Sequence, residues 1–220
     1  SKIMRKLVIL VLVSLFYSSF AWAGDCDQTI TEDHWNNVLG CSDNDHLIVN
    51  EGITFERDSN YVISANSDDN VKVTNYGTIR SSNKNHVLYF INGEGATIDN
   101  KSTGTIYSHK CCAINYKDRT GTINIYNAGT IQSRTHGTIT AWDSGSPTLN
   151  IENSGTITMS GTSVNSSNTG ALCAICATGS SGTVTITNTG TVKTSGNNNP
   201  AIYVEDSATS TITNSGTISG

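Results

Sequence analysis

Asn127-Ala128-Gly129-Thr130-Ile131 is the stretch of sequence that decides the fold, because versions of it recur along most of the chain. Five copies have the form Asn-x-Gly-Thr-Ile/Val, a sixth, from Asn100 to Ile106, is two residues longer, and a weaker one at 50–53 opens the series. Successive glycines are 25, 27, 25, 26, 35 and 26 residues apart. A fixed period of this length is typical of a repeat architecture. The repeated positions are Asn75, Asn100, Asn127, Asn153, Asn188 and Asn214; Gly77, Gly104, Gly129, Gly155, Gly190 and Gly216; and Ile79, Ile106, Ile131, Ile157, Val192 and Ile218.

The segments around the blocks indicate three short strands in each unit. An alternating segment such as Ile123-x-Ile125 precedes each block, and a short apolar patch such as Ala174-Ile175 lies between blocks. A unit of this size cannot bury its own apolar face, so the units must stack. The sequence therefore predicts an all-β fold, a right-handed single-stranded parallel β-helix of about seven coils over residues 46–220. The one long interval contains the polar stretch 162–170, which is interpreted as a loop insertion.

Stacking turns each repeated position into a ladder with a spacing of about 4.8 Å. The Ile/Val positions are expected to form an aliphatic ladder inside the helix. The asparagines are expected to pair their side-chain amides between coils, and the glycines to supply a positive φ in the turn. These ladders are interpreted as scaffold and not as a ligand site.

The N-terminal part of the chain lacks the repeat. Three basic residues within the first six precede the apolar run 7–20, and Ala21-Trp22-Ala23 lies before Gly24. This pattern predicts a signal peptide over residues 1–23, cleaved between Ala23 and Gly24. Residues 24–45 are then expected to form a cap that covers the open end of the first coil.

Export permits disulfide bonds. Cys26 and Cys41 bracket a short segment and are expected to pair within the cap. The sequence leaves the pairing of the other four cysteines open between local disulfides and buried thiols, and no bond is expected between the two pairs. These residues are Cys111, Cys112, Cys173 and Cys176. A Cys-x-x-Cys such as Cys173-x-x-Cys176 can also be redox-active or half of a zinc site, but no second such motif and no nearby histidine accompanies it.

Composition and charge exclude several classes of protein. Thr, Ser, Asn and Gly make up 101 of the 220 residues, which is unlike a helical enzyme. Beyond Gly24 the chain has 10 basic and 18 acidic residues and no basic stripe, so nucleic acid is not an expected partner.

Tandem Asn-x-Gly-Thr-Ile coils behind a signal peptide resemble the passenger domains of bacterial autotransporters, and the resemblance covers residues 46–220. It implies an exported protein at the surface of a Gram-negative bacterium or outside the cell. It also implies a longer gene, with the chain's own outer-membrane β-barrel expected beyond Gly220. The function expected is a structural stalk or adhesin without catalytic activity. Its partner would be a glycan or protein on a host or neighbouring cell, and no cofactor is expected.

A β-helical enzyme that cleaves polysaccharides, as a lyase or a glycoside hydrolase, is the first alternative. Such an enzyme needs carboxylates placed on one face across neighbouring coils. The acidic candidates stand at different offsets from their glycines, so they are not expected to line up, and no catalytic residue is assigned. They are Asp68, Asp69, Asp99, Asp118, Asp143 and Glu152.

An ice- or surface-binding solenoid is the second alternative. The threonines of the blocks form one row, but the row two residues on is irregular: Arg80, Tyr107, Gln132, Thr158, Lys193 and Ser219. The five histidines are scattered, with no pair at ligand spacing, so no metal site is expected. They are His34, His46, His86, His109 and His136.

Overall fold

The computed structural model describes residues 26–35, 39–58, 61–82, 86–142, 145–161, 172–178, 182–196, 199–207 and 209–220. The predicted signal peptide, its cleavage site between Ala23 and Gly24, and the predicted loop insertion over 162–170 lie outside these residues. All the regular structure within them is β-strand, and they contain no helix long and apolar enough to cross a membrane.

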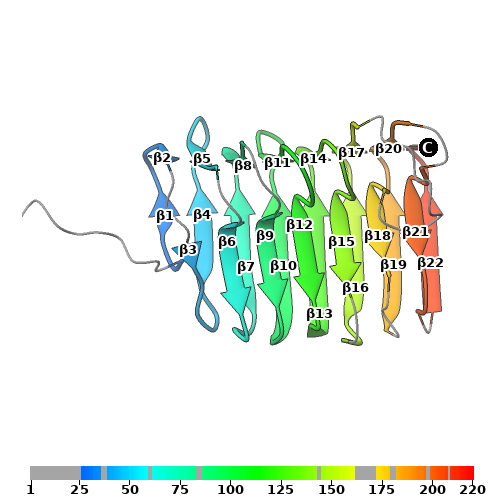
Figure 1. Cartoon of the computed structure of the whole chain (residues 1–220), viewed down its shortest axis with the longest axis horizontal. Helices are drawn as coiled ribbons and strands as arrows, with labels where there is room; N and C mark the ends of the chain where they lie inside the picture. The colour runs from blue at the N-terminus through cyan, green and yellow to red at the C-terminus, as the bar shows by residue number, and fades with distance from the viewer. Residues whose placement is uncertain are drawn as a thin grey trace, which may run out of the picture.

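Three parallel sheets, named A, B and C here, run along the molecule and enclose one apolar core (Figure 1). The chain visits the sheets in this order in each coil. Sheet A contains β1 (Thr29–Ile30), β4 (His46–Val49), β7 (Val71–Asn75), β10 (Glu94–Asn100), β13 (Thr120–Asn127), β16 (Thr148–Asn153), β19 (Thr183–Asn188) and β22 (Thr209–Asn214). Sheet B contains β2 (His34–Trp35), β5 (Thr54–Arg57), β8 (Thr78–Ser81), β11 (Thr105–Ser108), β14 (Thr130–Ser133), β17 (Thr156–Met159), β20 (Thr191–Thr194) and β23 (Thr217–Ser219). Sheet C contains β3 (Leu39–Gly40), β6 (Tyr61–Asn66), β9 (His86–Ile91), β12 (Ile114–Lys117), β15 (Ile139–Trp142), β18 (Ile175–Ala177) and β21 (Ile202–Val204).

Each strand pairs with the strand of the same sheet one coil further on, as β10 does with β13 and β13 with β16. The prediction of a parallel β-solenoid is confirmed. From His46 onward the described residues form six coils of three strands and a seventh that contributes β22 and β23. The segment assigned to the cap supplies β1, β2 and β3, one strand for each sheet, and so forms a further coil at the N-terminal end.

The inward positions of the strands form aliphatic ladders. In sheet A, Ile98, Ile125 and Ile151 stack in register with at most 1% of their surface exposed. The same row ends at Ile212, which is 47% exposed because no described coil covers it. The repeated aliphatic residues of sheet B lie in register in the same way. Ile79, Ile106, Ile131, Ile157 and Val192 are buried, and Ile218 is partly buried.

The repeated glycines are required by the close approach of neighbouring coils. The expectation that they supply a positive φ is wrong for the six glycines from Gly77 to Gly216, none of which has a positive φ, and it holds only for Gly52 of the weaker opening block, with a φ of 76°. A Cβ on Gly129 would lie 2.2 Å from the carbonyl oxygen of Gly104, and one on Gly155 would lie 2.1 Å from that of Gly129. No side chain fits at such distances. Comparable contacts with the preceding coil exist at Gly77, Gly104, Gly190 and Gly216.

A buried arginine fixes the bends between sheets C and A. Arg119 is 1% exposed and donates hydrogen bonds to the carbonyl oxygens of Gly95 (2.9 Å), Asn92 (2.5 Å) and Asp68. Its guanidinium carbon lies 5.4 Å from the ring centroid of Phe90. Burial lowers the pKa of Arg119 from its ordinary value. The side chain therefore ties its own bend to those of the two preceding coils.

Candidate functional site: a groove on the outer face of sheet A

The outer face of sheet A carries one row of side chains that departs from the Thr/Asn pattern of the scaffold. Alternation along β10 and β13 points Ile98 and Ile125 inward, so Asp99 and Tyr126 point outward. Strand register places these outward residues side by side on successive coils. The row, called the Asp99 row below, consists of Thr74, Asp99, Tyr126, Glu152, Thr187 and Thr213.

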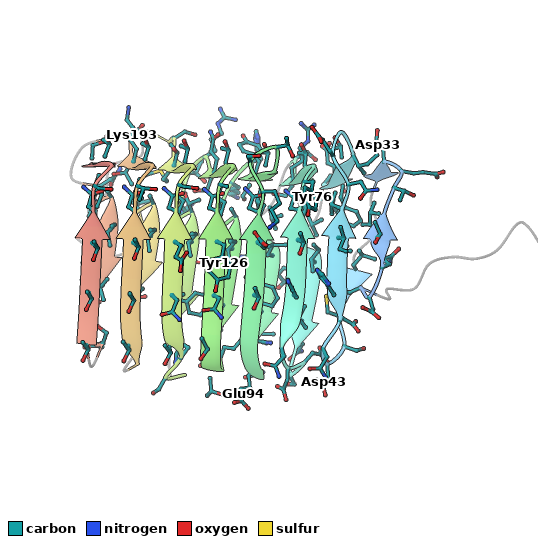
Figure 2. The ribbon with its side chains drawn as sticks, turned by 180° about the vertical axis from the view of Figure 1, so that it is seen from behind. Asp33, Asp43, Tyr76, Glu94, Tyr126 and Lys193 are labelled. Carbon is teal, nitrogen blue, oxygen red and sulfur yellow. A yellow bond between two sulfur atoms is a disulfide. The ribbon has the colours of Figure 1, made fainter. Side chains whose placement is uncertain are left out.

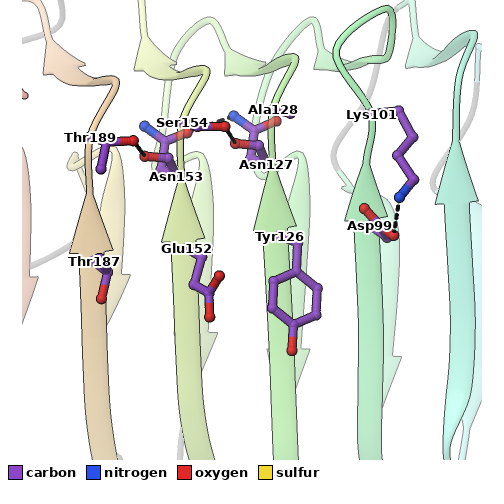
Figure 3. A pocket seen from close by; sticks show the side chains of 10 residues that line it. All are labelled: Asp99, Lys101, Tyr126, Asn127, Ala128, Glu152, Asn153, Ser154, Thr187 and Thr189. Atoms are coloured by element: carbon purple, nitrogen blue, oxygen red, sulfur yellow. Dashed lines mark hydrogen bonds and ion pairs between the residues drawn. The ribbon is translucent and has the colours of Figure 1, made fainter.

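A groove of about 250 Å³ crosses the Asp99 row over β10, β13, β16 and β19. Tyr126 stands between Asp99 on one side and Glu152 on the other (Figure 3). The lining residues are Asp99, Lys101, Tyr126, Asn127, Ala128, Glu152, Asn153, Ser154, Thr187 and Thr189.

Tyr126 is one of three large apolar or aromatic side chains that stay exposed in the described part of the chain, with 36% of its surface accessible. Figure 2 shows it on the broad face of sheet A, while Tyr76, 39% exposed, lies near the ends of the strands and does not line the groove. A half-exposed tyrosine offers an apolar ring face and a polar hydroxyl to the same ligand.

The charges of the groove are arranged asymmetrically. Asp99 forms an ion pair with Lys101, whose Nζ lies 2.7 Å from a carboxylate oxygen, and this hydrogen bond raises the pKa of Lys101. Glu152 is exposed and has no cation partner among the described residues. Since adjacent coils are about 4.8 Å apart, the backbone positions of Asp99 and Glu152 lie about 10 Å apart, with the tyrosine between them. The groove thus offers acceptors for hydroxyl groups on both sides of an aromatic ring.

The alignment of Asp99 with Glu152 corrects one sequence-based expectation. The six acidic candidates were expected not to line up, because their offsets from the repeated glycines differ. Register follows the asparagines, however, since Asn100 pairs with Asn127 and Asn127 with Asn153. The two extra residues of the long block lie between Asn100 and Gly104. When positions are counted from the glycines, Asp99 and Glu152 therefore do not match, although each directly precedes its asparagine.

The other acidic candidates that the structure describes do not line the groove. Asp69 lies in a bend, where its backbone N–H donates to Asp43 and its carboxylate accepts from the N–H of Glu94. Asp68 and Asp118 lie in bends as well, and Asp143 lies outside the described residues.

A buried ladder of asparagines forms the edge of the groove where sheet A ends. The Nδ2 of Asn127 donates to Oδ1 of Asn153 at 2.8 Å, to the carbonyl oxygen of Gly129 at 3.2 Å and to that of Thr156 at 3.1 Å. The same three bonds recur from coil to coil and fix the backbone turns beside the groove. All six predicted asparagines are in the ladder: Asn75, Asn100, Asn127, Asn153, Asn188 and Asn214.

All six cysteines form disulfides in the structure. Cys26 bonds to Cys41, the pair favoured from the sequence, and the open pairings resolve as Cys111 with Cys112 and Cys173 with Cys176. Sequence reasoning missed one constellation, because it looked for ligand pairs at short spacing. His86 comes to lie beside Cys111 and Cys112, with the three possible ligand atoms within 4.8 Å of one another. The sequence contains the information needed to find this cluster, since His86 and Cys111 are 25 residues apart. This is the length of one coil, which places the two residues side by side on successive coils.

The family model of the BigA third pectate lyase-like domain matches residues 23–219. No curated protein and no solved structure shows significant similarity to the chain.

Proposed function

The chain belongs to the family of the BigA third pectate lyase-like domain, and from this premise we propose that it is a β-helical passenger of an autotransporter. In this proposal the chain is exported and acts at the cell surface or outside the cell as a structural stalk and adhesin. The regular coils give the stalk, and the groove on sheet A binds a surface glycan of a host or neighbouring cell. The chain is proposed to have no catalytic activity.

The observation that carries the adhesin proposal is the placement of Tyr126 between Asp99 and Glu152 in a groove of a rigid face. Sugar rings present apolar faces and a rim of hydroxyl groups. An exposed aromatic ring packs on such a face, and carboxylate oxygens accept hydrogen bonds from the hydroxyls. Catalysis is not favoured, because a glycoside hydrolase needs two carboxyl groups that both act on the bond to be cleaved. Asp99 is instead paired with Lys101, and Glu152 is exposed.

Binding of the full chain to an array of surface oligosaccharides tests the proposal. Tyr126→Ala should reduce the affinity for a bound glycan about tenfold or more, which corresponds to about 1.4 kcal/mol. Tyr76→Ala is the matched control, because Tyr76 is equally exposed but does not line the groove. Equal losses in the two variants, or no loss in Tyr126→Ala, would contradict a glycan site in this groove.

A polysaccharide-cleaving enzyme is the second candidate, and the alignment of Asp99 with Glu152 favours it. Inverting glycoside hydrolases hold their two carboxyl groups about 6.5–9.5 Å apart, and these two side chains start from backbone positions two coils, about 10 Å, apart. Release of reducing ends or unsaturated products from a bound polysaccharide distinguishes the candidates. Turnover that disappears in Glu152→Gln while binding persists would establish the enzyme and overturn the non-catalytic proposal.

A further inference from the structure

Three residues with metal-binding side chains come together at the start of sheet C, away from the groove. His86 begins β9, and Cys111 and Cys112 lie in the turn before β12, one coil further on. One imidazole nitrogen and the two sulfur atoms lie within 4.8 Å of one another, and this is the one such cluster among the described residues. Cys112 is fully buried, and Cys111 and His86 are partly buried.

Backbone hydrogen bonds fix this turn independently of the bond between the two sulfurs. The N–H of Cys112 donates to the carbonyl oxygen of Gly137 in the next coil, and the carbonyl oxygen of Cys112 accepts from the N–H of Val87 in the preceding one, both at 3.1 Å. The hydroxyl of Ser108 donates to the carbonyl oxygen of Cys111 at 2.6 Å. Cys112 has a φ of 62°, an unfavourable region for a residue with a side chain, which persists only where the surroundings enforce it. The backbone that carries both sulfurs is therefore held beside His86 by contacts other than the disulfide, while the two sulfur atoms themselves move apart when the bond is opened.

The imidazole of His86 is held as a metal ligand would be. Its ring is stacked on those of Tyr61 and Tyr89, with centroids 5.8 and 5.0 Å away, so its orientation is fixed. Its Nδ1 is buried and has no hydrogen-bond partner among the described residues. Buried polar atoms without a partner are rare in folded proteins, and coordination of an ion satisfies such an atom.

We propose that Cys111, Cys112 and His86 form a Zn²⁺ site when the two cysteines are in the dithiol state. Zn²⁺ prefers sulfur and imidazole nitrogen ligands, and its bond lengths set the edges of a tetrahedral site at about 3.3–3.8 Å. The ligand atoms of this cluster lie within 4.8 Å of one another, and the two sulfurs, bonded to each other in the structure, reach such an edge by moving apart after reduction. A thiol reductant supplies two electrons and two protons to the disulfide and is itself oxidised to a disulfide. Zn²⁺ then displaces both thiol protons to solvent and forms two Zn–S bonds and one Zn–N bond, and water takes the fourth position.

Zinc titration of the full chain tests the site, with the purified protein either oxidised or reduced by a phosphine. The reduced chain should bind one Zn²⁺ at this site, seen also as thiolate-to-metal charge-transfer absorption when Co²⁺ is used, and the oxidised chain should not. The double variant Cys111→Ser with Cys112→Ser should no longer bind this one Zn²⁺ in the reduced state. The matched control is Cys173→Ser with Cys176→Ser, which removes the other pair of nearby cysteines. This variant should still bind one Zn²⁺ at Cys111, Cys112 and His86.

His86→Phe provides a second variant, because it keeps an aromatic ring against Tyr61 and Tyr89 and removes both imidazole nitrogens. It should weaken Zn²⁺ binding at least tenfold while the far-ultraviolet circular dichroism stays that of the folded chain. This variant also decides the question if the double serine variant fails to fold. Unchanged stoichiometry without Cys111 and Cys112, or unchanged affinity in His86→Phe, would overturn the proposal, as would the absence of Zn²⁺ from the reduced chain.

Discussion

Replacement of Asn127 by alanine should destabilise the solenoid more than the loss of any outward side chain. Asn127 is 2% exposed in the middle of the asparagine ladder. Its amide nitrogen donates to Asn153, Gly129 and Thr156, and its Oδ1 accepts from Asn100 at 2.8 Å. Alanine removes all four contacts, and two of the partners left behind, the side chains of Asn100 and Asn153, are buried.

The size of the effect follows from these contacts. A typical intramolecular hydrogen bond contributes about 1 kcal/mol net, and an unsatisfied buried partner costs about 1–3 kcal/mol. Four lost contacts therefore lower the free energy of unfolding by about 4 kcal/mol. For a chain of this size, about 2–4 °C is lost per kcal/mol, so the midpoint of thermal unfolding should fall by roughly 10 °C.

Thermal unfolding followed by circular dichroism measures the change, and Asn214→Ala is the matched control. Asn214 has the same position in the last described coil, where it accepts from Asn188 at 2.8 Å, but it is exposed. Water replaces its partners, so its loss should cost less than about 1 kcal/mol. Similar midpoints for the two variants would show that burial of the ladder does not set its contribution and would refute the reasoning.

Three further perturbations have defined outcomes. Arg119→Ala removes three hydrogen bonds to backbone carbonyl groups and the contact with Phe90, and it should cost about 3 kcal/mol in urea unfolding; a loss below about 1 kcal/mol would contradict the role assigned to this side chain. Burial lowers the pKa of His86 from 6.5 to about 4, so the unfolded chain binds more protons between these values. The free energy of unfolding should therefore fall by up to about 3 kcal/mol as the pH drops from 6.5 to 4, and the slope should flatten in His86→Phe. Cys26→Ser with Cys41→Ser opens a loop with a sequence separation of 15 residues and should cost about 3 kcal/mol, with faster hydrogen exchange confined to β1, β2 and β3; faster exchange along the whole solenoid would argue against a local role.

The fold could be predicted from the sequence because each repeated position does one physical task in every coil. The alternation before each block marks the inward side of sheet A, and the Asn-x-Gly-Thr-Ile block marks the turn and the strand of sheet B. The role of the glycine could not be read in the same way. A positive φ and a close backbone contact both favour glycine, and the distance of 2.2 Å from Gly104 to the added Cβ of Gly129 is a property of the stacked coils.

The candidate site was harder to predict, because it depends on register at the level of single residues. The two extra residues after Asn100 do not shift the strands, since Asn100 pairs with Asn127 and Thr105 with Thr130. The insertion is absorbed in the bend between sheets A and B. Alignment by asparagine and threonine places Asp99 beside Tyr126, whereas alignment by glycine does not.

The solenoid separates the residues that hold the coils together from those free to bind. Inward positions of sheet A are aliphatic in the stacked coils, and the asparagine recurs at the strand end because each amide needs the next one as its partner. Outward positions carry no such constraint, and the Asp99 row changes from threonine to aspartate, tyrosine and glutamate without any change in register. A binding surface can therefore vary from coil to coil while the scaffold beneath it stays the same. This separation explains why the repeated residues predict the fold so well and the activity so poorly.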